Sequence, residues 1–260
     1  MFFWGAQKSL LDQDDEEWQL ACWPWLLDNI IEIDAIRDCP LIVPNGTYFP
    51  GTKAEGKARA EHIFRCVAEL IGVADWPFDL VEQDARVDPI VSPTMIVQNA
   101  PGSPAGTFQL TSDYRLQVTY SPELVDDPGQ LIATFVHEIC HALMLTIDRS
   151  DPANEPPGGW ECEEFATDLL VTLLGFGIFG ANAAFQFDQY SDPATGMGGW
   201  STRRSGYLTE VEWAFALAVY FKITGKPFDD ASHWLKPGLF KQLKKCTAYL
   251  NKNETLLSWA

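Results

Sequence analysis

The strongest constraint on the fold is a short apolar segment, residues 131–145, that contains two histidines and a glutamate. Within it, His137-Glu138-Ile139-Cys140-His141 has the form His-Glu-x-x-His. The rest of the segment is apolar, apart from Thr134 and the weakly polar Cys140, which is typical of a buried helix. Burying two imidazoles and a carboxylate without a compensating ion costs free energy, so the segment predicts a metal-binding helix in the core.

The spacing of the two histidines suits a single metal ion. In a helix, residues four positions apart are rotated by about 40° and lie one turn along the axis, so both imidazoles project from one face. Two ring nitrogens can then reach a zinc ion at about 2.1 Å. Glu138, one position further round, can stand beside the ion and take a proton from the attacking water. We therefore expect Zn²⁺ as the cofactor, with His137 and His141 as ligands and Glu138 as general base.

A catalytic zinc ion needs a third protein ligand and an open fourth position. The next predicted helix, residues 160–174, supplies three glutamates, Glu161, Glu163 and Glu164. Glu164 is preferred because Asp168 follows four residues later on the same helical face. There it can accept the free N–H of a zinc-bound histidine and fix the tautomer of that ring. Glu161 remains the alternative ligand.

With these residues the chain resembles the gluzincin class of zinc metallopeptidases, in which the two histidines and a downstream glutamate bind zinc. The run Glu164-Phe165-Ala166-Thr167-Asp168 is similar to the third-ligand helix of CAAX-type endopeptidases. Those enzymes are membrane-embedded, so only the zinc site is carried over. The pattern Glu161-x-x-x-Phe165-Ala166 is similar to the ligand helix of the soluble ImmA/IrrE-type peptidases, which would make Glu161 the ligand. The resemblance covers about residues 131–175 and implies peptide-bond hydrolysis.

The leading interpretation is therefore a zinc metallopeptidase that acts on a protein or peptide substrate. The alternative is a zinc-binding sensor or partner-binding module with a peptidase-like site and little general proteolytic activity. Tyr207 is the candidate donor to the developing oxyanion, and Arg203, Arg204 and Tyr190 are other possible donors. The strand expected at residues 115–120, just before the metal-binding helix, is the candidate edge for pairing with an extended substrate.

Composition argues against several other classes of partner. The formal net charge is −18, from 36 acidic and 18 basic residues, and such a surface repels nucleic-acid phosphates. Residues 1–4 are apolar but lack a basic flank, so no secretory signal is expected. The longest apolar run, residues 169–181, is too short to cross a bilayer. Six cysteines without a paired C-x-x-C favour reduced thiols. We therefore expect a cytoplasmic protein without nucleic-acid or membrane partners.

Hydrophobic periodicity predicts a mainly helical α+β fold. We expect a single metallopeptidase domain over residues 1–260, with a mixed α/β part (1–128) and a helical part (129–260) that carries the zinc site. Strands at 78–81, 95–97, 107–110 and 115–120 should form a small, mostly antiparallel sheet before the zinc-binding helix, as in zincins. Helices are expected at 16–37 with an interruption at Pro24, at 56–71, 129–147 and 160–174, after a capping box formed by Thr209 and Glu212, and from 236 onward.

Overall fold

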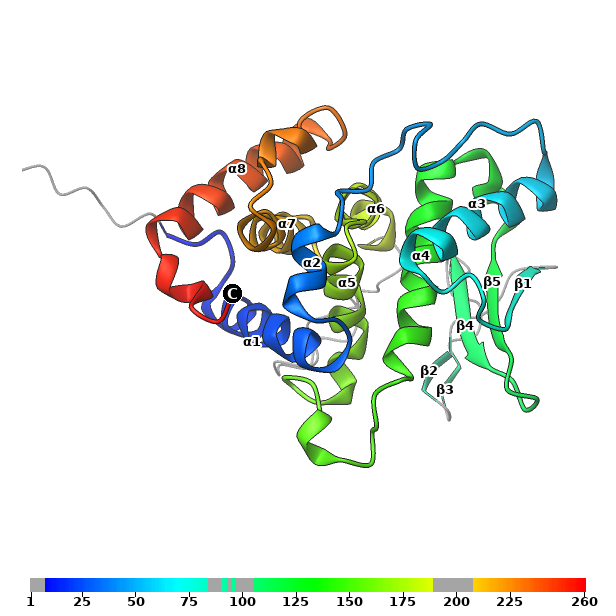
Figure 1. Cartoon of the computed structure of the whole chain (residues 1–260), viewed down its shortest axis with the longest axis horizontal. Coiled ribbons are helices and arrows are strands. Elements are labelled where there is room, and N and C mark those ends of the chain that lie inside the picture. The colour runs from blue at the N-terminus through cyan, green and yellow to red at the C-terminus, as the bar shows by residue number, and fades with distance from the viewer. Residues whose placement is uncertain (1–7, 84–89, 93–94, 97–104, 189–207) are drawn as a thin grey trace, which may run out of the picture.

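The computed structural model describes residues 8–83, 90–92, 95–96, 105–188 and 208–260. Within these residues the chain is mainly helical and has a small sheet at one side (Figure 1), so the α+β fold class is confirmed. Most of the predicted helices and strands begin and end within a few residues of their expected positions.

The N-terminal helices differ from the prediction in where they break. Helix α1 (Gln13–Asn29) continues through Pro24, and the chain breaks only before α2 (Ile33–Asp38). A proline inside a helix costs about 3 kcal/mol. Burial of Trp23, which is fully buried, and of its neighbours on α1 offsets this cost. The expected interruption at Pro24 is therefore wrong.

Helix α3 (Gly56–Ile71) precedes a three-stranded sheet of β1 (Phe78–Glu82), β5 (Leu116–Tyr120) and β4 (Gly106–Leu110), in that spatial order. Strands β1 and β5 are parallel, whereas β4 and β5 form an antiparallel hairpin, so the sheet is mixed. Strands β2 (Ile90–Ser92) and β3 (Met95–Ile96) form a separate antiparallel pair. Because β5 is bonded on both sides, it has no free edge, and the prediction that it pairs with a substrate is wrong.

The helical part consists of α4 (Pro128–Met144), α5 (Glu163–Leu173), α6 (Gly177–Asp188), α7 (Glu210–Thr224) and α8 (Pro237–Lys252). At the start of α7, the Glu212 carboxylate accepts the Thr209 N–H at 2.8 Å, in keeping with the predicted capping pair. Short 3-10 turns occupy Pro122–Asp126, Pro152–Asn154, Trp160–Cys162, Phe228–Ala231 and Glu254–Leu257.

Helix α4 lies at the centre of the arrangement. It contacts α3 and the sheet on one side and α5 and α6 on the other, while α7 packs between α6 and α8 (Figure 1). Buried apolar side chains from all of these helices and from β5 form one hydrophobic core. The sheet is thus held against the same helix that carries the two histidines. None of the helices in the part of the chain that the structure describes is long and apolar enough to cross a membrane.

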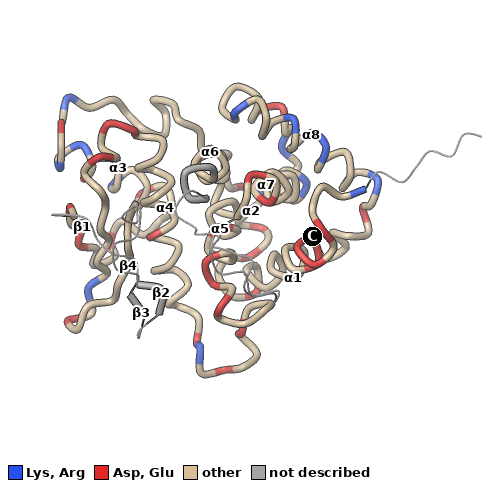
Figure 2. The backbone as a smooth tube through the Cα atoms, turned by 180° about the vertical axis from the view of Figure 1, so that it is seen from behind, with Lys and Arg blue, Asp and Glu red and all other residues tan. Residues whose placement is uncertain are grey.

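Charge is unevenly distributed over the molecule. Residues 222–260 carry seven lysines and three acidic residues, although the whole chain has a net charge of −18. Figure 2 shows lysines along α8 and acidic residues on α1 and around α5. The acidic surplus is therefore concentrated away from α8.

Candidate metal centre

Helix α4 presents its two histidines on one face, as the spacing predicts. The helix begins at Pro128, which lacks an N–H, and the Asp127 side chain caps it by accepting the Gln130 N–H at 3.1 Å. One turn apart, the Nε2 atoms of His137 and His141 lie 3.1 Å from each other. Two nitrogens at this separation, deep on one helix face, need either a shared proton or a cation between them.

Helix α5 brings a carboxylate to the same point. The Oε2 atom of Glu164 lies 3.2 Å from Nε2 of His137 and 3.4 Å from Nε2 of His141. The ligand atoms of these three residues all lie within 4.8 Å of one another. The group could therefore hold a metal ion.

The other two glutamates of this segment point elsewhere. Glu163 forms an ion pair with Arg149, whose guanidinium lies 4.2 Å from the ring centroid of Trp160. Glu161 is exposed and is not part of the metal-binding group found among the described residues. Only Glu164 of the three is brought to the histidines, which favours it over Glu161 as the third ligand.

Asp168 stands behind His137, on the side away from Glu164. Its Oδ1 atom accepts a hydrogen bond from Nδ1 of His137 at 2.9 Å, and its Oδ2 atom accepts the backbone N–H of Leu208 at 2.9 Å. Both carboxylate oxygens are thus used in a buried position. With the proton on Nδ1, the Nε2 lone pair of His137 faces the metal-binding group. Asp168 was predicted to fix the tautomer of a zinc-bound histidine in this way.

The electrostatics of the group reflect burial and close charges. Burial would lower the pKa of His137, but its hydrogen bonds to Asp168 and Glu164 outweigh burial and hold the pKa well above its ordinary value. Partial burial would raise the pKa of Glu164, yet hydrogen bonds to the two imidazoles hold that pKa well below its ordinary value. The two opposite shifts have the same cause, the short distances between the carboxylates and the imidazoles.

Glu138 is buried beside the group and does not belong to it. Its residue is 7% exposed, and burial raises the pKa of its carboxyl group, while the two imidazoles act in the opposite direction. A carboxylate with a raised pKa is a better proton acceptor than an exposed glutamate. This is the position and the chemistry expected of a general base.

Strand β4 closes the site on the side of Glu138. A Cβ atom at Gly106 would lie 2.5 Å from Cγ2 of Thr134, 2.8 Å from the Thr119 carbonyl oxygen and 3.3 Å from Cγ of Glu138. Only glycine therefore lets the strand approach α4 so closely. Two residues further on, the ring of Phe108 is nearly parallel to that of His141, with 11° between their planes and 6.3 Å between their centroids.

Several residues of the site could not be recognised from the sequence. Gly106 and Phe108 follow no motif, and the Leu208 amide is a backbone group that any residue except proline would supply. Tyr207, predicted to stabilise the oxyanion, lies outside the described residues, as do the other predicted donors, Tyr190, Arg203 and Arg204. The predicted roles of these four side chains therefore stay predictions.

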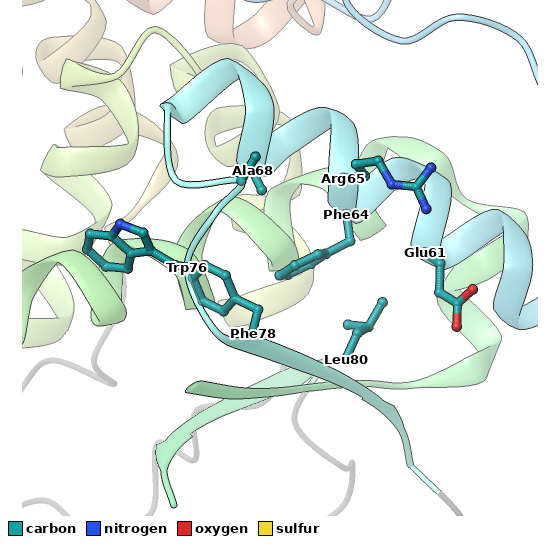
Figure 3. A pocket seen from close by; sticks show the side chains of 8 residues that line it. Glu61, Phe64, Arg65, Ala68, Trp76, Phe78 and Leu80 are labelled. Carbon is teal, nitrogen blue, oxygen red and sulfur yellow. The ribbon is translucent and has the colours of Figure 1, made fainter. Parts of the chain in front are cut away.

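A separate hollow lies at the opposite edge of the sheet from β4. This groove of about 210 Å³ between α3 and β1 is shown in Figure 3 and is lined by Glu61, Phe64, Arg65, Ala68, Ala74, Trp76, Phe78 and Leu80. It contains none of the metal-binding residues. The candidate metal ligands and this groove are thus at different places.

Comparison with known proteins gives no relative for this arrangement. No family model matches the chain, and no curated protein or solved structure shows significant similarity to it. A function is therefore inferred from the site itself.

Proposed function

We propose that this protein is a zinc-dependent metallopeptidase that hydrolyses peptide bonds. The observation that carries the proposal is the convergence of His137, His141 and Glu164, with ligand atoms within 4.8 Å of one another. Asp168 behind His137 and Glu138 beside the group complete the set of side chains that such an enzyme uses. The likeness of the motif to the gluzincin pattern supports the same proposal.

The donor set favours a catalytic ion over a structural one. Two imidazoles and one carboxylate are ligands that zinc accepts, and structural zinc sites are usually closed by four protein ligands. Here the group found among the described residues has three members. The Glu164 side chain is 43% exposed, so the group opens to solvent on its side. An open fourth position is where a water molecule and a substrate carbonyl would meet.

Each of these side chains has a separate role in the proposed reaction. A bound zinc ion would lower the pKa of a coordinated water and polarise the scissile carbonyl. Glu138 would accept the proton of the attacking water and pass it to the leaving amine. Asp168 holds the His137 ring in the tautomer that leaves Nε2 free. Among the described strands β4 pairs only with β5, so its outer edge can pair with an extended peptide next to Glu138.

The test compares the purified full-length protein with its Glu138→Gln variant. We expect both to contain one zinc ion per chain by elemental analysis, because Glu138 is not a ligand. Cleavage of denatured casein, followed by mass spectrometry with and without chelator, should fall at least about 100-fold in the variant. Glu123→Gln, an exposed glutamate outside the site, is the matched control and should cleave normally. Cleavage at the wild-type rate by Glu138→Gln would exclude the mechanism.

The alternative, a zinc-binding sensor or partner-binding module, gives a different result in the same experiment. It predicts one zinc ion per chain but no cleavage of casein or of lysate proteins by either form. Comparing the proteomes of cells that express wild type or Glu138→Gln extends the test to a single cellular target. A fragment that appears only with the wild type would favour the peptidase and name its substrate.

A further inference from the structure

A row of side chains on β4 leads away from the metal centre. Successive side chains of a strand point to opposite faces, so Gly106, Phe108 and Leu110 share one face. Gly106 lies against Glu138 and Phe108 stacks on His141, which shows that this face is turned toward α4. Leu110 is the next member of the row, roughly 7 Å beyond Phe108.

Leu110 is unusually exposed for its face of the sheet. It is 51% exposed, whereas its direct partner on β5, Leu116, is 9% exposed and the next β5 residue on that face, Val118, is fully buried. Helix α4, which covers the rest of the row, ends at Met144. The row thus runs from a glycine packed against Glu138 to an apolar side chain that no part of the described chain covers fully.

The hairpin that follows Leu110 carries a second exposed apolar residue in a strained conformation. Tyr114 has φ +61° and is 80% exposed. A bulky residue in the left-handed region is an outlier, because glycine or asparagine adopts it at lower cost. The loop is held by hydrogen bonds of the Thr111 hydroxyl, which donates to Asp113 and accepts the Arg115 N–H at 3.0 Å. The short loop between β4 and β5 requires a residue in this conformation, and the exposed ring of Tyr114 is thereby presented next to the end of β4.

We propose that Leu110 and Tyr114 form a recognition surface for a bulky apolar side chain of the peptide substrate. The inference rests on the proposed peptidase function. A peptide paired with the edge of β4 that no described strand occupies would place every second side chain on the face of Leu110, at intervals of roughly 7 Å. Because Leu110 follows the residue stacked on His141, the recognised side chain lies one or two residues from the cleaved bond. The substrate class is thus an extended peptide with an aliphatic or aromatic residue at that position.

The first experiment measures cleavage preference. A synthetic library of decapeptides, randomised at its central positions, is incubated with the zinc-loaded protein, and the cleavage sites are read by mass spectrometry. We expect enrichment of bulky apolar residues at one fixed position beside the cut. For the Leu110→Gln and Tyr114→Asn variants, kcat/KM for peptides with a bulky apolar residue at the preferred position should fall about tenfold, mainly through a higher KM. For peptides with alanine at that position, kcat/KM should change little. Leu70→Gln, a partly exposed leucine on α3, is the control and should match wild type.

The second experiment measures binding without turnover. A fluorescein-labelled peptide with the preferred residue, and its alanine counterpart, are titrated with Glu138→Gln protein and followed by anisotropy. When Leu110→Gln is combined with Glu138→Gln, binding of the peptide with the preferred residue should weaken about tenfold. Binding of the alanine peptide should not change. Tyr114→Asn should keep or raise the Tm, because asparagine tolerates this backbone conformation, so lost affinity would not reflect unfolding.

The outcomes separate the two proposals. If the wild type cleaves peptides and Leu110→Gln keeps its preference and affinity, the recognition surface is wrong and the peptidase proposal stands. If the wild type neither cleaves nor binds any library peptide while it contains zinc, the peptidase proposal fails and the recognition surface fails with it.

Discussion

Glu164 and Asp168 contact the imidazole of His137 from opposite sides. Each contact restricts the conformations that the other side chain can adopt. Asp168 fixes the His137 ring through Nδ1, and Glu164 meets the same ring at Nε2. They lie one helical turn apart on α5, so a single helix positions both. The geometry of the site at this scale therefore depends on the register of α5 against α4.

Substitution of the candidate third ligand gives the sharpest test at this scale. Glu164→Gln should reduce the zinc content of protein dialysed against micromolar zinc to a small fraction of one ion per chain, since an amide oxygen is a poor zinc ligand. Glu161→Gln, three residues earlier and exposed, should retain a full ion. Elemental analysis of both variants provides the measurement. The reverse result would make Glu161 the ligand and would require the start of α5 to rearrange.

At the scale of elements, helix α1 anchors the loop that leads into α5. The indole N–H of Trp18 donates to the Pro157 carbonyl at 2.8 Å, and that of Trp25 donates to the Asn154 carbonyl at 3.1 Å. The Trp18 ring also packs edge-on against Phe165, the neighbour of Glu164. Two hydrogen bonds from one helix thus fix the connection between the two metal-binding helices.

Loss of one of these bonds should weaken metal binding without unfolding the protein. In Trp18→Phe the ring packing is largely kept, but the loop loses a hydrogen bond with a net value of about 1 kcal/mol, so the Kd for zinc should rise up to about fivefold. Competition with a zinc-binding dye measures this. Trp23→Phe is the matched control, because the Trp23 N–H has no hydrogen-bond partner among the described residues. It should lower the Tm and leave the Kd unchanged.

The contact between α6 and α7 offers a test of packing alone. A Cβ atom at Gly180 would overlap the ring of Trp213, which is buried on α7. Gly180→Ala should therefore lower the free energy of unfolding by about 1–3 kcal/mol. Gly238→Ala, on α8 where nothing lies within 4 Å, should raise it by about 0.4–1 kcal/mol. Urea denaturation of both variants measures the difference, and a similar change in both would contradict the packing argument.

The sequence predicted which helices and strands form better than it predicted where they break and how they pair with one another. Apolar periodicity located α3 to the residue, and the histidine spacing placed both imidazoles on one face of α4. Pro24 misled because local propensity carries no information on how deeply α1 is buried. The pairing of β5 on both sides could not be predicted either, because β5 returns to lie beside β1 only after a long stretch of chain. Contacts such as Gly106 against Glu138 depend on how two elements approach each other, which no local pattern encodes.

For the whole molecule, metal binding should appear as thermal stability. A ligand that binds only the folded state at about a hundred times its Kd stabilises by about 2.7 kcal/mol. For a chain of this size that corresponds to a rise in Tm of roughly 5–10 °C. Differential scanning fluorimetry with zinc and with chelator measures the shift. Glu164→Gln should show much less of it, and an equal Tm in zinc and chelator for the wild type would contradict a specific site.

The carboxylate of Asp168 has one more consequence, since it accepts from a side chain on α4 and from the backbone just before α7 at once. Displacing either donor would leave one of the two buried carboxylate oxygens without a hydrogen bond. The Leu208 amide is therefore a built-in reporter: its nitrogen and proton resonances should move when the metal centre fills, with no probe attached to the protein.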